Sequence, residues 1–208
     1  MENHHLLHPV YFPNVATLAL IVKLPVIWEV YDNFQKQTFR NRCYIATDQG
    51  KHMLNVPIKH IGGNQGRQLF KEVKIDYSSA WQKQHWKTLQ TSYRTSPFFE
   101  YYEDDLSPIF EKKYEFLMDL NFETIQFFCD SFQVTMPLKK SKNYQKTPLD
   151  IVDNRSLAIA KTNFSFVQEE YFQVFGERHG FLKNLSGLDL LFNKGPEAME
   201  YLNSIKLE

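Results

Sequence analysis

Residues 33–42 combine amide and cationic side chains at a spacing that suits the binding of an anion. The candidate binding residues in this segment are Gln35, Lys36, Arg40, Asn41 and Arg42. In an extended strand alternate side chains share a face, which places Lys36, Arg40 and Arg42 together. Arginine presents a planar fork of donors to a carboxylate or phosphate. A solvated edge strand, on which charges deter aggregation, explains the same pattern.

His85 and Glu100 are the candidate acid–base residues. His85 lies within the apolar arc of a predicted amphipathic helix, where it is either a general base or a buried neutral histidine held by a hydrogen bond. The reference pKa of histidine, about 6.5, suits proton transfer near neutral pH. Glu100 is flanked by four aromatic residues and either loses hydration among them or points to water. Trp86 and Tyr93 are candidates to line a sugar or base pocket.

Strand and helix patterns must bring these residues together. The predicted strands are 6–12, 26–31, 39–47, 51–58, 72–75 and 134–138, and the predicted helices are 14–23, 78–94, 108–120, 122–132, 167–178, 187–193 and 196–205. Residues 48–50 are a hairpin turn signal, and residues 62–66 form a glycine-rich loop. We expect a mixed α/β fold in one domain, 1–208, whose N-terminal half supplies a sheet of four to six strands covered by the later helices. The first two strands are predicted to pair in parallel through a short helical crossover.

Single residues mark the ends of several helices. Pro13 suits a first helical position, Asn121 suits a cap between two helices, and Gly195 suits a left-handed C-terminal position. Asn184, Ser186 and Asp189 precede or enter an apolar helix, and we interpret them as capping residues.

Composition excludes several classes of protein. The 208 residues carry 24 Lys and Arg against 24 Asp and Glu, and 43% are hydrophobic. This balance argues against disorder and against a dedicated DNA-binding protein, which needs excess positive charge. Two cysteines are too few for a disulfide framework, so we expect two buried thiols in a reducing cytoplasm. No apolar run reaches the roughly 20 residues that span a membrane.

The common sequence motifs for cofactors and catalysis are absent. The chain has no GxGxxG, P-loop, GxSxG, HExxH or CxxC motif, so no cofactor is identified. His4, His5 and His8 form an N-terminal cluster that is either a metal site or a set of polar side chains on the surface.

Several blocks of sequence resemble the WbqC-like protein family. They are YFP at 11–13, FQKQ at 34–37, RNR at 40–42, LNVP at 54–57, WQKQHW at 81–86, YRTSPFFEYY at 93–102, YFQVF at 171–175 and GFLKNLSGLDLLFNKGP at 180–196. The resemblance covers nearly the whole chain, and the last block is its most specific part. At Gly187 similar proteins usually carry a bulky aliphatic residue. The glycine in this chain therefore replaces a core contact.

The resemblance implies a role in bacterial surface polysaccharide biosynthesis of the O-antigen type. A transferase that moves glycine, another amino acid or an acyl group to an amino sugar is one hypothesis, with a nucleotide sugar as the small-molecule substrate. In that hypothesis His85 or Glu100 is the base, Gln35 and Asn41 stabilise the oxyanion, and Lys36, Arg40 and Arg42 bind the anion. The alternative is a non-catalytic module that binds a glycan precursor or a protein. Neither hypothesis fixes an oligomeric state.

Overall fold

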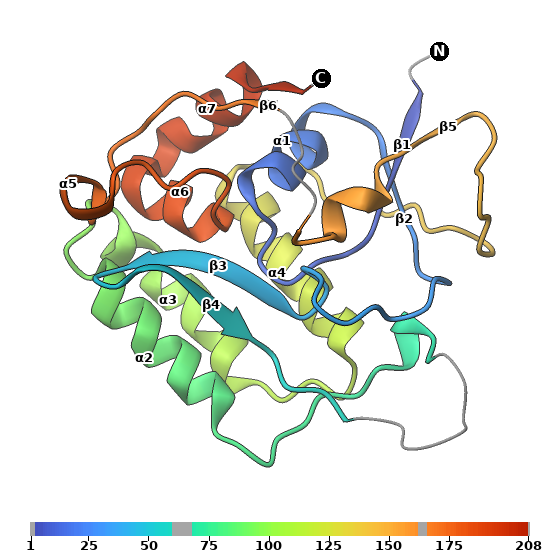
Figure 1. Ribbon diagram of the computed structural model, residues 1–208, viewed down its shortest axis with the longest axis horizontal. Coiled ribbons are helices and arrows are strands. Elements are labelled where there is room, and N and C mark those ends of the chain that lie inside the picture. The colour runs from blue at the N-terminus through green and yellow to red at the C-terminus, as the bar shows by residue number, and fades with distance from the viewer. Residues whose placement is uncertain (1–2, 60–67, 162–165, 208) are drawn as a thin grey trace.

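A computed structural model describes residues 3–59, 68–161 and 166–207 (Figure 1). Its strands are β1 (His4–Leu7), β2 (Val26–Trp28), β3 (Arg42–Thr47), β4 (Gly50–Asn55), β5 (Ile151–Asp153), β6 (Phe166–Val167) and β7 (Lys206–Leu207). Its α-helices are α1 (Val15–Lys23), α2 (Trp81–Tyr93), α3 (Phe99–Glu111), α4 (Leu117–Ser131), α5 (Gly176–His179), α6 (Gly187–Lys194) and α7 (Ala198–Ser204). Short 3-10 turns are η1 (Phe70–Glu72), η2 (Arg155–Ala158) and η3 (Gly195–Glu197). The predicted mixed α/β class is confirmed, while the loop at 62–66 lies outside the described residues.

A small parallel sheet has the strand order β2-β1-β5. Leu6 lies opposite Ile27 on one side and Asp153 on the other, so the predicted parallel pairing of the first two strands is confirmed. α1 is the crossover between β1 and β2. Its N-cap is Asn14, whose side chain accepts from the backbone of Thr17, so Pro13 precedes the cap and is not the first helical residue.

The β3–β4 hairpin is separate from the parallel sheet. Thr47 pairs with Gly50 across a two-residue turn, as the sequence predicts. Gly50 has a φ of 93°, a value that glycine adopts without steric cost. The expected single sheet of four to six strands is wrong, because the strands divide into one parallel sheet and two antiparallel pairs. The hairpin lies between α2 and α6: the amide of Ala46 donates to Tyr93 of α2, and the carbonyl of Tyr44 accepts from Ser186.

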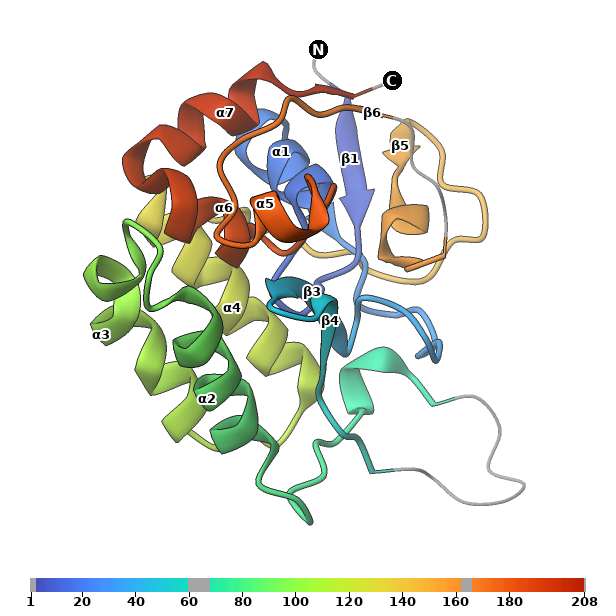
Figure 2. The same ribbon diagram turned by 60° about the vertical axis from the view of Figure 1, so that its left-hand side comes forward.

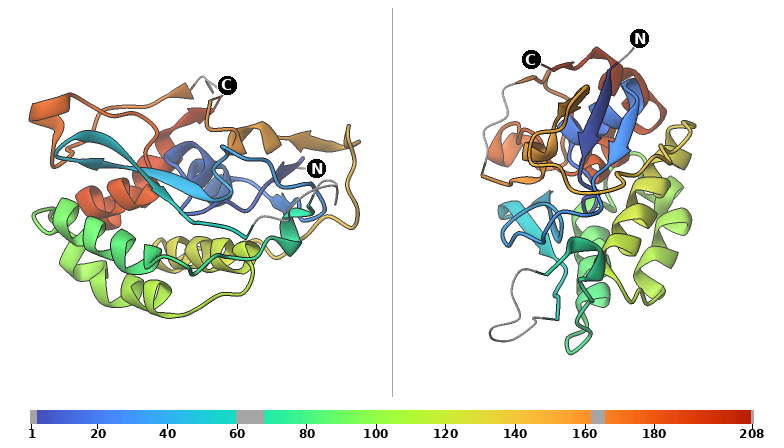
Figure 3. Two further views of the ribbon diagram at one scale, coloured as in Figure 1. Left: turned by 60° about the horizontal axis from the view of Figure 1, so that its bottom comes forward. Right: turned by 90° about the vertical axis from the view of Figure 1, so that its right-hand side faces the viewer.

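Helices α2, α3 and α4 pack side by side on the opposite side of the molecule from β1 and β5 (Figures 2 and 3). The predicted helices 108–120 and 122–132 are wrong in their boundaries. Pro108 lies inside α3. Proline has no backbone N–H, so the carbonyl four residues earlier loses its helical donor, and that carbonyl belongs to the exposed residue Asp104. Asn121 is not a cap but a buried residue of α4, and its amide donates to the carbonyls of Pro9 and Arg40. It therefore fixes the backbone that presents Arg40.

The chain after α4 has less regular structure than its sequence pattern indicates. Residues 134–138 are not a strand. Instead, the backbone of Trp28 bonds to Lys139 and Ser141, so the strap (residues 139–148) begins along the edge of β2. The predicted strand 72–75 is reduced to isolated β-bridges at Lys74 and Ile75, and Glu72 belongs to η1. Within the predicted helix 167–178 the described helical segment is α5, at its end.

Close packing explains the glycine at the start of α6. A Cβ on Gly187 would lie 2.1 Å from Leu18 of α1 and 3.0 Å from Phe128 of α4. A bulky residue at this position therefore requires the side chains of Leu18 and Phe128 to shift. The two cysteines, Cys43 and Cys129, are free and buried, as predicted. No helix within the described ranges is long and apolar enough to cross a membrane.

Candidate functional site at the parallel sheet edge

Charged side chains converge where the three parallel strands end. His8 follows β1, Glu29 follows β2, and Asp153 ends β5 with Arg155 two residues later. The chain leaves β1 towards β2 on one side and reaches β5 on the other, so this edge is a topological switch point, where open α/β sheets bind ligands. His8 is 3% exposed and Glu29 is 1% exposed. We call His8, Glu29, Asp32, Arg40 and Arg155 the edge cluster.

His8, Asp32 and Arg40 form one contact group inside this cluster. Asp32 Oδ2 lies 3.2 Å from His8 Nε2 and 3.1 Å from Arg40 Nη2, and the two nitrogens are 2.6 Å apart. Arg40 is 1% exposed, and its guanidinium lies 5.6 Å from the ring centroid of Phe70. Within the described chain, Arg40 Nε and Nη1 and His8 Nδ1 have no hydrogen-bond partner. Unpaired buried donors are costly, so this group is not optimised for stability alone.

Electrostatics keeps the His8 ring neutral. Its pKa is lowered to about 4, chiefly by burial and also by the charges of Arg40 and Arg155, while Asp32 opposes this shift. Burial alone would raise the pKa of Asp32, but hydrogen bonding and charge from His8, with Arg40, lower it overall. With its proton on Nε2 the ring donates to Asp32, and Nδ1 is a free base. With its proton on Nδ1 the ring accepts from Arg40 instead.

Glu29 and Arg155 join the sheet edge to the strap. Glu29 Oε1 accepts from the backbone of Tyr31 at 2.8 Å and from Ser141 Oγ at 3.0 Å. Its Oε2 lies 3.6 Å from Arg155 Nη1. Arg155 also holds Asp153 with two nitrogens and donates to the carbonyls of two strap residues, 145 and 146. One guanidinium therefore fixes the strap above the sheet.

A pocket of about 270 Å³ lies between the strap and the sheet. Its lining includes Leu6, Ile27 and Ile151 from the three strands, together with Glu29 and Lys142. Small-molecule pockets usually measure about 300–1,000 Å³. This one therefore suits a ligand much smaller than a nucleotide sugar.

The structure separates the residues predicted in segment 33–42. The segment is a series of turns rather than a strand, with Gln37 in the left-handed region at a φ of 60°. Gln35 and Lys36 are exposed, whereas Arg40 lies in the edge cluster. The expected alternation of faces fails because the backbone reverses direction between residues 36 and 41.

Asn41, Arg42 and His85 gather instead around Asn55 of β4. Asn41 donates to the side chain of Asn55 at 3.1 Å, and Arg42 pairs with Asn55 in the hairpin. His85 Nδ1 lies 3.1 Å from the Tyr11 hydroxyl. Burial lowers the pKa of His85 to about 4, while the Asn55 backbone opposes this shift. These contacts match a neutral histidine held by a hydrogen bond, and Arg40 does not share its surroundings.

The other predicted site residues lie elsewhere. The Glu100 side chain is 74% exposed in the first turn of α3 and lies 3.8 Å from Arg94. Trp86 packs against Phe99 and Phe110. Tyr93 is buried, and its hydroxyl donates to Asp189. Glu100, Trp86 and Tyr93 are therefore not part of the edge cluster.

Asp189 has a different role from the predicted cap. It is fully buried and accepts from Tyr93 at 2.7 Å, Tyr171 at 2.7 Å and Gln173 at 2.8 Å. Burial raises its pKa, although the three donors oppose that shift. Ser186 caps α6 by accepting from Leu188, as predicted. We call Asp189 and its three donors the Asp189 network.

The N-terminal histidines do not form a metal site. His4 contacts Lys139, His5 contacts Asn154, and His8 belongs to the edge cluster. No group of three metal-ligating side chains gathers among residues 3–59, 68–161 and 166–207.

The edge cluster has its own sequence signal. A polar residue directly follows each apolar strand, at His8, at Glu29 and near Asp153.

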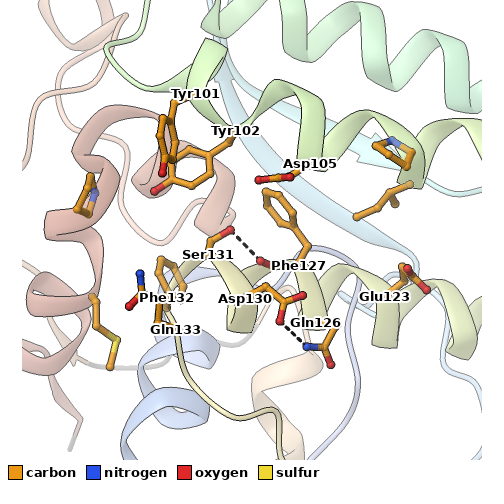
Figure 4. Close-up of a pocket in the computed structure, with 14 residues that line it drawn as sticks. Tyr101, Tyr102, Asp105, Glu123, Gln126, Phe127, Asp130, Ser131, Phe132 and Gln133 are labelled. Atoms are coloured by element: carbon orange, nitrogen blue, oxygen red, sulfur yellow. Dashed lines mark hydrogen bonds between the residues drawn. The ribbon is translucent and has the colours of Figure 1, made fainter.

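A larger groove of about 660 Å³ lies between α3, α4 and the start of α7 (Figure 4). Tyr101 and Tyr102 lie on one wall, with Asp105 beside them, while Phe127 and Asp130 come from α4. The lining residues described include aromatic, acidic, amide and aliphatic side chains, with no histidine, cysteine, lysine or arginine. The groove therefore offers a binding surface.

One comparison with known proteins identifies a family. A family model described as the WbqC-like protein family matches residues 8–164, which include the whole edge cluster but not the block at 180–196. An uncharacterised protein of Mycobacterium tuberculosis is 30% identical over 204 residues, covering 83% of this chain and 86% of the relative. No solved structure matches the chain.

Proposed function

Because the chain belongs to the WbqC-like protein family, we propose that it is a transferase that joins an acyl or aminoacyl group to an amino sugar of a surface polysaccharide precursor. The observation that carries this proposal is the edge cluster, where the His8–Asp32 pair lies in the same buried charge group as Glu29, which lines the pocket. Acyl transfer to an amine needs a base, an orienting acid and donors for the oxyanion.

The residues of the edge cluster can fill each of these roles. In the tautomer that donates to Asp32, His8 Nδ1 takes the proton from the attacking amine and returns it to the leaving group. The bond between the acyl carbon and its leaving group breaks as the new amide bond forms. Arg40 Nε and Nη1 are donors for the oxyanion that develops between these steps. Because both are buried in the free protein, acyl binding must displace the packing around Phe70.

The test is an acyl-transfer assay with an acyl thioester as donor and an amino-sugar nucleotide as acceptor, read by mass spectrometry. We expect the amide product with the native chain, and at least a 100-fold slower rate with His8→Asn, within the range for a lost general base. His179→Asn is the matched control, because the His179 ring bonds to the Asp48 carbonyl in the hairpin turn and is not part of the edge cluster. Full activity of His8→Asn would exclude His8 as the base.

His85 is the competing base, with Asn41 and Arg42 beside it. The same assay on His85→Asn separates the two sites. Loss of activity in this variant, with an unchanged unfolding midpoint, would move the proposed chemistry to the surroundings of Asn55. A lowered unfolding midpoint with normal activity is the result that we expect.

The groove of Figure 4 favours a second candidate function, a non-catalytic binding module. Tyr101 is 73% exposed, although Phe99 and Tyr102 beside it are buried, so the aromatic segment is not a continuous apolar patch. Thermal-shift screening with nucleotide sugars, glycine and acyl carriers separates the two functions. A shift that Tyr101→Ala removes and His8→Asn preserves would support the binding module.

A further inference from the structure

Glu29 has an unusual environment for a buried carboxylate. It lines the pocket, yet it is 1% exposed. Oε1 accepts two hydrogen bonds, from Tyr31 and Ser141. Oε2 accepts none within the described chain and has only the 3.6 Å ion pair with Arg155. A buried carboxylate is most stable when hydrogen-bond donors surround both oxygens, so Oε2 can accept a further donor.

The Arg155 guanidinium already donates hydrogen bonds to other acceptors. Its Nε donates to Asp153 at 2.8 Å, and its Nη2 donates to the other oxygen of that carboxylate at 2.6 Å. Its Nη1 donates to the carbonyl of Gln145 at 2.9 Å. At 3.6 Å the contact with Glu29 is beyond hydrogen-bond length. A further donor for Oε2 would therefore come from the pocket.

The other charges around the pocket lie at its rim. The Lys140 ammonium lies 4.7 Å from the ring centroid of Phe122, so its charge is directed at that ring. Lys142 is exposed and lines the pocket, as do the uncharged Asn143 and Gln145. The interior thus presents one incompletely paired carboxylate, while a cation lies at the entrance.

The sheet supplies an aliphatic floor. Leu6 and Ile27 lie opposite each other in the register of β1 and β2, and Ile151 lines the same pocket from β5. Glu29 follows Ile27 by two residues, so an extended backbone directs both side chains to this face. A volume of about 270 Å³ over this floor accepts a short branched chain next to the carboxylate.

We propose that this pocket binds a primary ammonium group carried on a short aliphatic chain, of which a branched-chain α-amino acid is the natural form. The ammonium donates to Glu29 Oε2, and the side chain covers Leu6, Ile27 and Ile151. This inference rests on the proposed function, for which it names the transferred group as aliphatic aminoacyl. The carbon that loses its leaving group is then the carboxyl carbon of that amino acid, and the acceptor amine supplies the new bond.

The test is calorimetric titration of the native chain with L-leucinamide, L-leucine and N-acetyl-L-leucinamide. We expect saturable binding of the first two and none of the third, since acetylation removes the ammonium. Glu29→Gln should weaken leucinamide binding at least 10-fold, because glutamine retains an acceptor for Tyr31 and Ser141 but loses the charge. Glu72→Gln, a substitution of an exposed carboxylate on η1, is the matched control and should bind as the native chain does.

A second variant tests the floor without touching the charge. Ile27→Ala should weaken leucinamide binding while changing glycinamide binding less than 2-fold. Equal binding of the acetylated amide, or no binding of any amine by a folded native chain, would overturn the proposal. If leucinamide binds but no transfer occurs, the pocket assignment stands and the proposed transferase fails. If the chain transfers acyl groups from donors that lack an ammonium but does not bind leucinamide, the proposed transferase stands and the pocket assignment fails.

Discussion

The edge cluster and the Asp189 network are both buried and charged, but they differ in how completely their polar atoms are paired. Asp189 accepts from three side chains, and each donor lies 2.7–2.8 Å away. In the edge cluster, Arg40 Nε and Nη1 and His8 Nδ1 have no partner within the described residues. Full pairing stabilises a fold, whereas incomplete pairing lowers stability and is typical of residues retained for binding or catalysis.

Asp189→Ala should produce the largest loss of stability. It leaves the hydroxyls of Tyr93 and Tyr171 and the amide of Gln173 without their shared acceptor in the core. We expect the free energy of unfolding to fall by about 3–5 kcal/mol, the range for breaking a buried charged group. Urea denaturation followed by fluorescence measures this change. A loss below about 1 kcal/mol would remove the distinction between the two regions.

Acid should weaken the fold through His8 and His85. Their folded pKa values, about 4, lie below the unfolded reference of 6.5. Above pH 6.5 neither state is protonated and the full stability remains. As the pH falls from 6.5 to 4, the unfolded chain binds protons that the folded chain does not, so the free energy of unfolding decreases.

Each histidine should contribute a loss of about 3 kcal/mol over this interval, since one pKa unit is about 1.4 kcal/mol. Denaturation midpoints measured from pH 7.5 to 4.5 give the slope. The His85→Asn variant should show roughly half the slope of the native chain. An unchanged slope would indicate that its imidazole is protonated in the folded chain.

The double substitution Arg40→Met with Asp32→Leu should change stability by less than about 1 kcal/mol, because replacing both partners of a buried ion pair with apolar groups of similar volume is often neutral. The same variant should lose transferase activity. Parallel measurements of urea midpoint and product formation test both points. Unfolding of the variant would assign this ion pair a structural role equal to that of Asp189.

Glu100→Gln should have the smallest effect. Its side chain is 74% exposed, and the ion pair with Arg94 is 3.8 Å long. Exposed pairs contribute about 0–1 kcal/mol, so we expect a change within about 0.5 kcal/mol. Thermal unfolding at low and high salt provides the measurement, and a large salt-sensitive loss would contradict the exposed position.

Local chemistry explains the parts of the fold that the sequence predicts. Pro25 ends the first helix, β-branched residues follow in β2, and the Asp48-Gln49 turn closes the hairpin. Gly195 has the positive φ expected after α6. The boundary between α3 and α4 is not predictable in this way, because Pro108 is accommodated inside a helix and Asn121 is recruited by the distant Pro9 and Arg40.

The candidate site depends on contacts between distant residues. Arg40 is predicted to bind an anion from its neighbours in sequence, yet its partners are His8 and Asp32. Glu29 carries no local signal beyond its place after an apolar strand. Its importance emerges only when β1, β2 and the strap meet. Sequence patterns therefore predicted a binding role for the Arg40 cation, but they did not identify His8 and Asp32 as its partners.

The two thiols have a practical consequence for attaching a label to the strap. Burial raises the pKa of Cys129 to about 12 and that of Cys43 further, which keeps both sulfurs protonated and unreactive at neutral pH. A cysteine engineered at exposed Lys142 would then be the preferred point of attachment for a fluorophore or spin label. Labelling at this single engineered cysteine therefore does not require the removal of Cys43 and Cys129.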